Sequence, residues 1–175
     1  MFADPEKILN QFSLNPGLQV ADFGAGSGFY TLIAARAVGE KGRVFAVDLQ
    51  KDLLIRIKNT ATSENLKNIE VVWGDVEKAG GTGLKDASVD RVIISNTFFQ
   101  IENKDSLVSE ANRLLKSNGK AMVVEWSRAP GSQVSSANYM ISRAEVSDLF
   151  LKAGFELEKE IKAGERHYGL IFTKK

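Results

Sequence analysis

Short apolar runs rich in β-branched residues alternate along the chain with stretches in which apolar residues recur every three or four positions. This alternation is typical of β-α-β units around a largely parallel sheet. The pattern predicts an α/β fold with seven strands. They cover Leu18–Phe23, Arg43–Val47, Ile69–Trp73, Arg91–Ser95, Lys120–Glu125, Phe155–Ile161 and His167–Thr173.

Helical periodicity fills most of the connections between these strands. The pair Asn118-Gly119 predicts a left-handed helix stop, and Ser142 with Glu145 predicts a capping box at a helix start. The segment Ser127–Tyr139 is rich in turn formers and is expected to be a loop. The predicted helices cover Phe29–Val38, Asp52–Glu64, a stretch through Leu107 and Leu115 that stops at Asn118-Gly119, and Ser142–Ala153.

The turn Lys162–Arg166 between the last two strands is too short to hold a crossover helix. These strands therefore have to pair antiparallel, as a hairpin. A sheet that is parallel through six strands and reversed in the seventh is a Rossmann-like, doubly wound arrangement, but not an ordinary dinucleotide-binding sheet. Residues 1–175 fit a single domain, because a chain of this length buries a core without disulfides or metal.

Three alternating glycines, Gly24, Gly26 and Gly28, follow the first strand and lead into a helix. Ligands of open α/β sheets bind at the carboxyl ends of the strands, where such a turn lets the backbone approach closely. A dinucleotide site uses the spacing G-x-G-x-x-G, whereas this turn reads G-x-G-x-G. Asp22 stands two residues before Gly24 and would repel a pyrophosphate, but it suits a ligand amino group. The turn therefore disfavours an NAD(P)-dependent oxidoreductase.

Acidic residues also end the second and third strands. Asp48 lies twenty residues after Gly28, where a carboxylate accepts both hydroxyls of a ribose. Asp75 follows the third strand and has the chemistry to accept a hydrogen bond from the exocyclic amine of adenine. The structural alternatives are an exposed turn carboxylate at Asp48 and a loop cap at Asp75.

The fourth strand ends at Asn96, which we expect to face a ligand. Phe98 and Phe99 follow it, and either the edge of the core or the wall of a substrate pocket explains a pair of aromatic residues there.

These residues stand within longer motifs, which are Val20–Thr31, Gly42–Asp48, Trp73–Asp75, Asp90–Val92 and Arg113–Lys120. Together with the final strand they resemble class I S-adenosylmethionine (SAM)-dependent methyltransferases of the ubiquinone/menaquinone-biosynthesis type, within the type 11/31-like group. The resemblance implies the strand order 3-2-1-4-5-7-6 with strand 7 antiparallel. It also implies SAM as cofactor, S-adenosylhomocysteine as product and a small molecule as methyl acceptor.

The resemblance further implies where the cofactor lies. Asp22 and the glycine turn would surround its methionine part, Asp48 would hold the ribose, and Leu49 would pack on the adenine. The full set of expected cofactor-binding residues is Asp22, Gly24, Ala25, Gly26, Gly28, Tyr30, Thr31, Asp48, Leu49, Gly74, Asp75, Val76 and Asn96.

A catalytic base is not required by this chemistry, because the sulfonium methyl is already activated and positioning supplies most of the rate. His167, the single histidine, is the first candidate base, and Tyr30 and Glu125 are rivals. A structural role for His167 is the alternative. Trp126, with Tyr139 and Met140, would wall the acceptor pocket or belong to the core.

Composition narrows the remaining choices. The chain has 23 Lys and Arg against 22 Asp and Glu, so no overall field favours nucleic acid. The absence of cysteine excludes disulfides and thiolate metal sites, and it excludes the arsenite-type activity of some relatives, because those relatives need cysteines. Acidic residues near the N-terminus and the lack of a long apolar run predict a cytoplasmic protein without membrane insertion. We expect no metal, since only Glu125 stands near the strand ends where catechol-type relatives need an acidic cluster.

The acceptor, the acceptor atom and the oligomeric state, monomer or homodimer, stay open at this point. Two alternatives to a small-molecule methyltransferase also stay open. One is a SAM-binding adaptor or pseudoenzyme subunit that needs a partner for activity, and the other is a protein or RNA methyltransferase.

Overall fold

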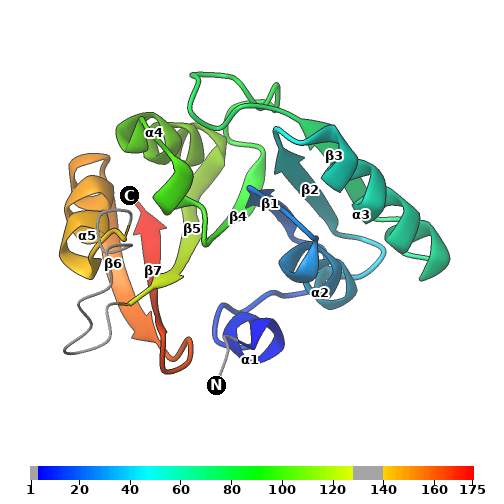
Figure 1. The fold of residues 1–175 in the computed structure, drawn as a ribbon, viewed down its shortest axis with the longest axis horizontal. Helices are drawn as coiled ribbons and strands as arrows, with labels where there is room; N and C mark the ends of the chain where they lie inside the picture. The colour runs from blue at the N-terminus through cyan, green and yellow to red at the C-terminus, as the bar shows by residue number, and fades with distance from the viewer. Residues whose placement is uncertain (1–3, 128–139) are drawn as a thin grey trace.

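Strand β7 (His167–Lys174) runs antiparallel to both of its neighbours, β5 (Leu115–Trp126) and β6 (Phe155–Ile161). The computed structural model describes residues 4–127 and 140–175 and contains one seven-stranded sheet in the order β3-β2-β1-β4-β5-β7-β6 (Figure 1). The other pairings join β1 (Gln19–Phe23), β2 (Arg43–Asp48), β3 (Ile69–Trp73), β4 (Val89–Ser95) and β5, and all are parallel. The expected fold class and strand order are confirmed.

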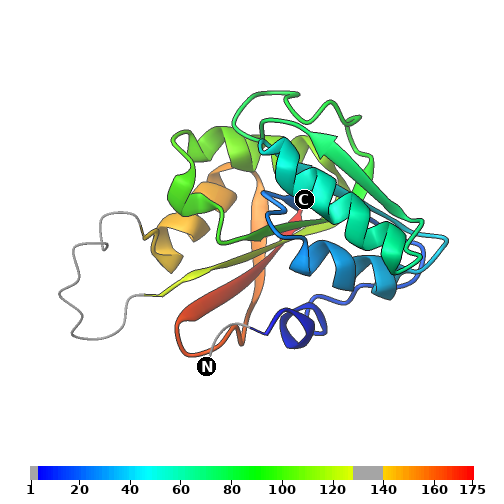
Figure 2. The same cartoon turned by 45° about the vertical axis from the view of Figure 1, so that its right-hand side comes forward.

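Helices cover both faces of the sheet (Figure 2). On one face lie α1 (Pro5–Leu9), α2 (Phe29–Val38) and α3 (Lys51–Ser63), and on the other lie α4 (Lys104–Leu114) and α5 (Arg143–Lys152). Successive residues of a strand point to opposite faces, so each central strand supplies both layers of the core. In β4, for example, Ile93 packs on the α1 and α2 side while Val92 and Ile94 pack on the α4 and α5 side.

The end of α4 differs from the sequence prediction. The helix was expected to stop at Asn118-Gly119, but it ends at Leu114. Leu115 is extended and fully buried, and it pairs with Val89 of β4, so tertiary pairing ends the helix early. The left-handed residue Asn118, with φ of 61°, makes its turn inside β5 instead.

The short helix α1 was not predicted. Its signals are Asp4, whose side chain accepts a hydrogen bond from the Lys7 backbone N–H, followed by Pro5 at the first helical turn. The buried residues Ile8 and Leu9 hold it against the α2 side of the core. The predicted capping box of Ser142 and Glu145 is present at the start of α5. Of the expected loop Ser127–Tyr139, only Ser127 belongs to the described residues.

A buried carboxylate ties the segment before β4 to α4. Glu110 accepts hydrogen bonds from the Thr82 hydroxyl at 2.7 Å, the Gly80 backbone N–H at 3.0 Å and the Arg113 guanidinium at 2.7 Å. Burial acts to raise the pKa of Glu110, but these hydrogen bonds outweigh it and lower the pKa to about 2. The charged form of Glu110 therefore stabilises the fold.

No helix in the described part of the chain is both long enough and apolar enough to cross a membrane.

The aromatic cluster under α5 gives a test of the core. Phe150 is fully buried and stacks on Phe172 with 4.2 Å between ring centroids. Phe150→Ala is expected to lower the free energy of unfolding by about 3–5 kcal/mol, because it removes apolar contacts and leaves a cavity. Leu151→Ala on the exposed side of the same helix is the matched control and should change it by less than about 1 kcal/mol. Urea denaturation measures both, and equal losses would contradict this account of the core.

Candidate active site

The glycine turn after β1 has the backbone shape that its sequence predicted. Gly24, Gly26 and Gly28 all have positive φ, at 68°, 54° and 81°. A Cβ on Gly24 would lie 2.8 Å from the Thr97 hydroxyl oxygen, and a Cβ on Gly28 would lie 2.7 Å from Ile57. The turn therefore passes too close to the end of β4 and to α3 for any larger residue.

A cavity of about 570 Å³ lies at the carboxyl edge of the sheet, over the ends of β1, β2 and β4. It sits where strand order reverses between β1 and β4, which is where open α/β sheets bind ligands. The sequence-predicted residues that line it are Asp22, Gly24, Ala25, Gly26, Tyr30, Asp48, Leu49, Gly74, Val76 and Asn96.

Asp22 is buried beneath this cavity, at 3% exposure. The Thr31 hydroxyl donates a hydrogen bond to its carboxylate at 2.6 Å, so Thr31 orients Asp22 rather than lining the cavity. Burial raises the pKa of Asp22 to about 6, against the Thr31 hydrogen bond and with help from the nearby charge of Asp48. The charged form of Asp22 therefore lowers the stability of the fold at neutral pH, and buried charges of this kind are typical of functional sites.

Asp48 fixes the turns on either side of itself. One carboxylate oxygen accepts from the Gly26 backbone N–H at 2.9 Å, and the other accepts from the Gln50 backbone N–H at 2.8 Å. Each oxygen keeps a further lone pair, so the carboxylate has capacity for two more donors such as a pair of hydroxyls. Leu49 beside it is 56% exposed and lies at the cavity wall.

The carboxylate of Asp75 is engaged within its own loop. It accepts from the Glu77 backbone N–H at 3.0 Å and pairs with the Lys78 ammonium at 3.0 Å. The Lys78 hydrogen bond lowers the pKa of Asp75. Its neighbours Gly74 and Val76 line the cavity and the Asp75 side chain does not, which matches the loop-cap alternative.

The Asn96 side-chain oxygen is a buried polar atom of the cavity that has no hydrogen-bond partner within the described residues. The Tyr30 hydroxyl is also buried at the cavity and lies near the Ser95 side chain. Asn96 is also held in a left-handed conformation, with φ of 51°. Burial raises the pKa of Tyr30 to about 12, so its phenol stays protonated and able to donate at neutral pH. A buried polar group without a partner is costly, and a ligand that pairs with it removes that cost.

His167 lies at the predicted edge of the sheet, opposite Trp126 in the β5–β7 pairing. Its ring stacks on Trp126 with 4.1 Å between centroids, and neither ring nitrogen has a hydrogen-bond partner in the part of the chain that the structure describes. Burial lowers its pKa, which keeps the imidazole neutral at neutral pH. His167 is not among the residues that line the cavity, and Trp126 lines a separate hollow with Met140 and Tyr168.

The two phenylalanines after β4 have different places. Phe98 is fully buried in the core, whereas Phe99 is 43% exposed and faces another hollow. Phe98 therefore belongs to the edge of the core rather than to the wall of a pocket.

Glu125 at the end of β5 is buried and accepts hydrogen bonds from the Thr97 and Phe98 backbone N–H groups.

Several cavity residues were not predicted from the sequence. Ser95 and Thr97 stand beside Asn96, and Phe29 opens α2, so their nearness to predicted positions is the signal that would have found them. Pro5 had no such signal, because it reaches the cavity through the fold of α1.

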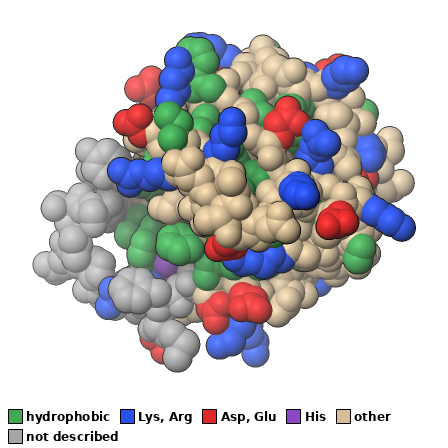
Figure 3. All heavy atoms as spheres, turned by 90° about the vertical axis from the view of Figure 1, so that its right-hand side faces the viewer, with side chains coloured by type: hydrophobic (Ala, Val, Ile, Leu, Met, Phe, Trp, Pro, Cys, Tyr) green, Lys and Arg blue, Asp and Glu red, His purple; other side chains and the backbone are tan. Residues whose placement is uncertain are grey.

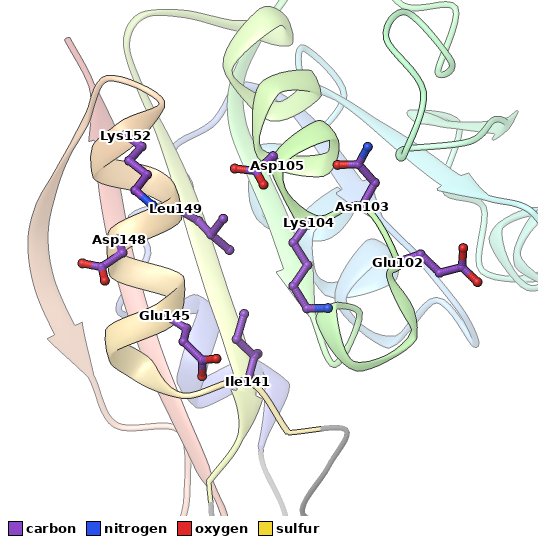
Figure 4. A pocket seen from close by; sticks show the side chains of 9 residues that line it. All are labelled: Glu102, Asn103, Lys104, Asp105, Ile141, Glu145, Asp148, Leu149 and Lys152. Atoms are coloured by element: carbon purple, nitrogen blue, oxygen red, sulfur yellow. The ribbon is translucent and has the colours of Figure 1, made fainter.

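A further hollow of about 630 Å³ lies between the start of α4 and α5 (Figure 4). Lys104 and Lys152 share it with acidic side chains, and it does not include the glycine turn. On the face shown in Figure 3, Lys and Arg side chains lie among Asp and Glu side chains and form no basic stripe. Within residues 4–127 and 140–175 there is no cluster of three or more His, Asp or Glu side chains suited to a metal ion.

The two buried carboxylates Asp22 and Glu110 should respond oppositely to replacement by the neutral amide. The pKa of Asp22 is raised from 3.8 to about 6, so its contribution to stability is present below pH 4 and is lost as pH rises through 6. Asp22→Asn should therefore raise the free energy of unfolding at pH 8 by about 1–3 kcal/mol, with the gain disappearing near pH 4. Glu110→Gln should lower the free energy of unfolding at pH 8, because the lowered pKa of Glu110 means that its carboxylate stabilises the fold above pH 4.5. Urea denaturation at both pH values tests the pair, and a loss of stability in Asp22→Asn at pH 8 would contradict it.

Comparison with known proteins identifies the family. A family model described as a methyltransferase domain matches residues 14–169. The solved structure of a SAM dependent methyltransferase from Aquifex aeolicus superposes with a TM-score of 0.87 and 27% identity, over 98% of this chain and 90% of that one.

Two curated relatives have similar sequences. A probable cobalt-precorrin-6B C(15)-methyltransferase (decarboxylating) from Sulfurisphaera tokodaii is 26% identical over 86% of this chain and 76% of its own length. A ubiquinone/menaquinone biosynthesis C-methyltransferase UbiE from Hydrogenovibrio crunogenus is 31% identical over 66% of this chain. The matched part covers 44% of the length of that relative. The chain belongs to the methyltransferase domain family and is a class I SAM-dependent methyltransferase.

Proposed function

We propose that this protein transfers the methyl group of SAM to a small-molecule acceptor, with residues 1–175 acting as one domain. The observation that carries the proposal is the cavity itself, where a glycine turn, two carboxylates and the buried polar atoms of Asn96 and Tyr30 meet. Its volume of about 570 Å³ falls within the range of sites that enclose a cofactor-sized molecule.

The residues present fit SAM at each part of the molecule. Asp22 is charged above pH 6 and would pair with the α-amino group. The free lone pairs of Asp48 suit the two ribose hydroxyls, and the exposed side chain of Leu49 would pack on the adenine beside Gly74 and Val76. Gly24, Ala25, Gly26 and Gly28 shape the turn around the methionine part, and Thr31 holds Asp22 in position.

When bound, SAM supplies an activated sulfonium methyl. What remains for the chain is to position an acceptor, exclude water and, for some acceptors, take up a proton. Asn96 and Tyr30 would lie beside the transferred group, since both line the cavity with buried polar atoms. His167 is neutral and able to accept a proton, and it lies at the same edge as Trp126. We keep it as the first candidate base, ahead of Tyr30.

The acceptor is proposed to be a small molecule rather than nucleic acid or protein. On the face shown in Figure 3 the charges are interspersed and offer no track for a phosphate backbone, and the net charge of the chain is only +1. Both named relatives are C-methyltransferases that act in the chemistry of small molecules by their names, so carbon acceptors belong in any test panel. We further propose a cytoplasmic location and a monomer or homodimer.

The direct test is calorimetric binding of SAM and S-adenosylhomocysteine, followed by turnover with a panel of small carbon, oxygen and nitrogen acceptors. Release of S-adenosylhomocysteine that depends on the acceptor is the expected result. Turnover only after a partner protein is added would favour the adaptor alternative. A folded sample that binds neither compound would end the proposal.

Asp48→Ala tests the ribose contact. Loss of two charge-assisted hydrogen bonds to the cofactor should weaken SAM binding by about 30-fold or more, equivalent to about 2 kcal/mol. The matched control is Asp52→Ala, an exposed acidic residue in the first turn of α3, which should bind SAM as the wild type does. Equal affinity of Asp48→Ala and wild type, measured by calorimetry, would show that the ribose lies elsewhere.

A further inference from the structure

Glu125 ends β5 and is 2% exposed. A single carboxylate oxygen accepts two hydrogen bonds, from the Thr97 backbone N–H at 2.7 Å and from the Phe98 backbone N–H at 2.8 Å. These donors are successive residues of the turn that follows β4. Glu125 therefore holds a backbone turn that belongs to a different strand.

That turn builds one wall of the cofactor cavity. Asn96 lies in a left-handed conformation, and its side-chain oxygen is buried in the cavity wall without a partner among the described residues. The Thr97 hydroxyl donates to the Phe23 carbonyl oxygen at 3.0 Å and lies against Gly24. The turn thus joins the end of β5, through β4, to the glycine turn after β1.

This conformation needs support from outside the turn. A left-handed non-glycine residue costs of order 1 kcal/mol, and buried N–H groups that lose their acceptor cost more. The Asn96 backbone N–H bonds to the Val124 carbonyl oxygen at 2.8 Å, but the next two N–H groups bond to Glu125. Without that carboxylate, the turn would gain by rotating these N–H groups toward water, which would move Asn96 and Thr97.

We propose that Glu125 is a positioning residue of the methyltransferase site, which fixes the turn after β4 so that Asn96 and Thr97 form the cofactor-facing wall. The inference rests on the proposed function, since it assigns that wall to SAM. Glu125 itself is not among the residues that line the cavity, and one of its oxygens is already occupied by two donors. It therefore acts through Asn96 and Thr97 rather than as a base.

Two variants of Glu125 separate this role from others. Glu125→Leu introduces an apolar side chain of similar size that has no hydrogen-bond acceptor, and it should raise the Kd for S-adenosylhomocysteine by about tenfold or more. Glu125→Gln keeps an acceptor oxygen and should restore affinity to within about threefold of the wild type. The KM for SAM should follow these changes, whereas the KM for the acceptor should not.

The matched control is Glu158→Gln in β6, whose side chain contacts the opposite end of β5. Glu158 pairs with Lys120 of β5 at 2.6 Å and accepts from the Thr173 hydroxyl at 2.8 Å, far along the strand from Glu125. This variant should leave the Kd for S-adenosylhomocysteine unchanged. A Glu125→Leu variant that binds S-adenosylhomocysteine as tightly as Glu158→Gln does would overturn the proposal. A Glu125→Gln variant that binds it normally but loses turnover would also overturn the proposal, because Glu125 would then be a proton donor or acceptor.

Amide hydrogen exchange of the ligand-free protein gives a readout that does not depend on SAM. Thr97 and Phe98 amides should be protected in the wild type and in Glu125→Gln, and they should exchange at least about tenfold faster in Glu125→Leu. The Ile93 amide in the middle of β4 should not change. Unchanged exchange at Thr97 and Phe98 in Glu125→Leu would refute the role of Glu125, even if SAM proved not to be the ligand. Faster exchange in this variant, together with a wild type that does not bind SAM, would refute only the proposed function.

Discussion

Backbone N–H groups at the carboxyl edge of the sheet bond to side-chain carboxylates, and the shape of the cavity depends on these bonds. Asp48 accepts from Gly26 and Gln50, and Glu125 accepts from Thr97 and Phe98. A turn satisfies only some of its own N–H groups, so the remaining buried ones need acceptors from elsewhere. Each of these acids stands at the end of the strand next to the turn that it holds, and the parallel sheet brings those ends together.

At two carboxylates of this edge, Asp22 and Glu125, burial disfavours the charged form. Burial raises the pKa of Asp22 to about 6 and that of Glu125 to about 7, so at neutral pH Asp22 is mostly charged whereas Glu125 is close to half protonated. Glu110 is equally hidden from solvent, yet three donors make its charged form favourable. Glu110 has the Arg113 guanidinium as a charged partner, whereas the hydrogen bonds to Asp22 and Glu125 come from a hydroxyl and from backbone N–H groups.

The sequence predicted what local pattern controls. Alternating apolar runs located the strands, the short turn before His167 required the antiparallel hairpin, and glycine spacing predicted the turn shape. The sequence did not predict features that depend on contacts between residues far apart along the chain. Leu115 leaves the helix because of its pairing with Val89, and the carboxylate of Asp75 turns to Lys78, which a strand-end pattern does not reveal. The cofactor-binding roles of the predicted residues remain proposals, and the same reasoning from strand ends missed the part that Glu125 plays in holding Thr97.

The reversal of β7 divides the edge of the sheet into two differently built regions. Gly24, Asp48 and Gly74 come from the first half of the chain, whereas Trp126 and His167 reach the same edge through β5 and the returning strand. A change in the connections around β5 and β7 would alter the side of the edge that holds Trp126 and His167 and leave the glycine turn in place. The turn at Asn96 lies where the two sides meet, because β4 stands between β1 and β5.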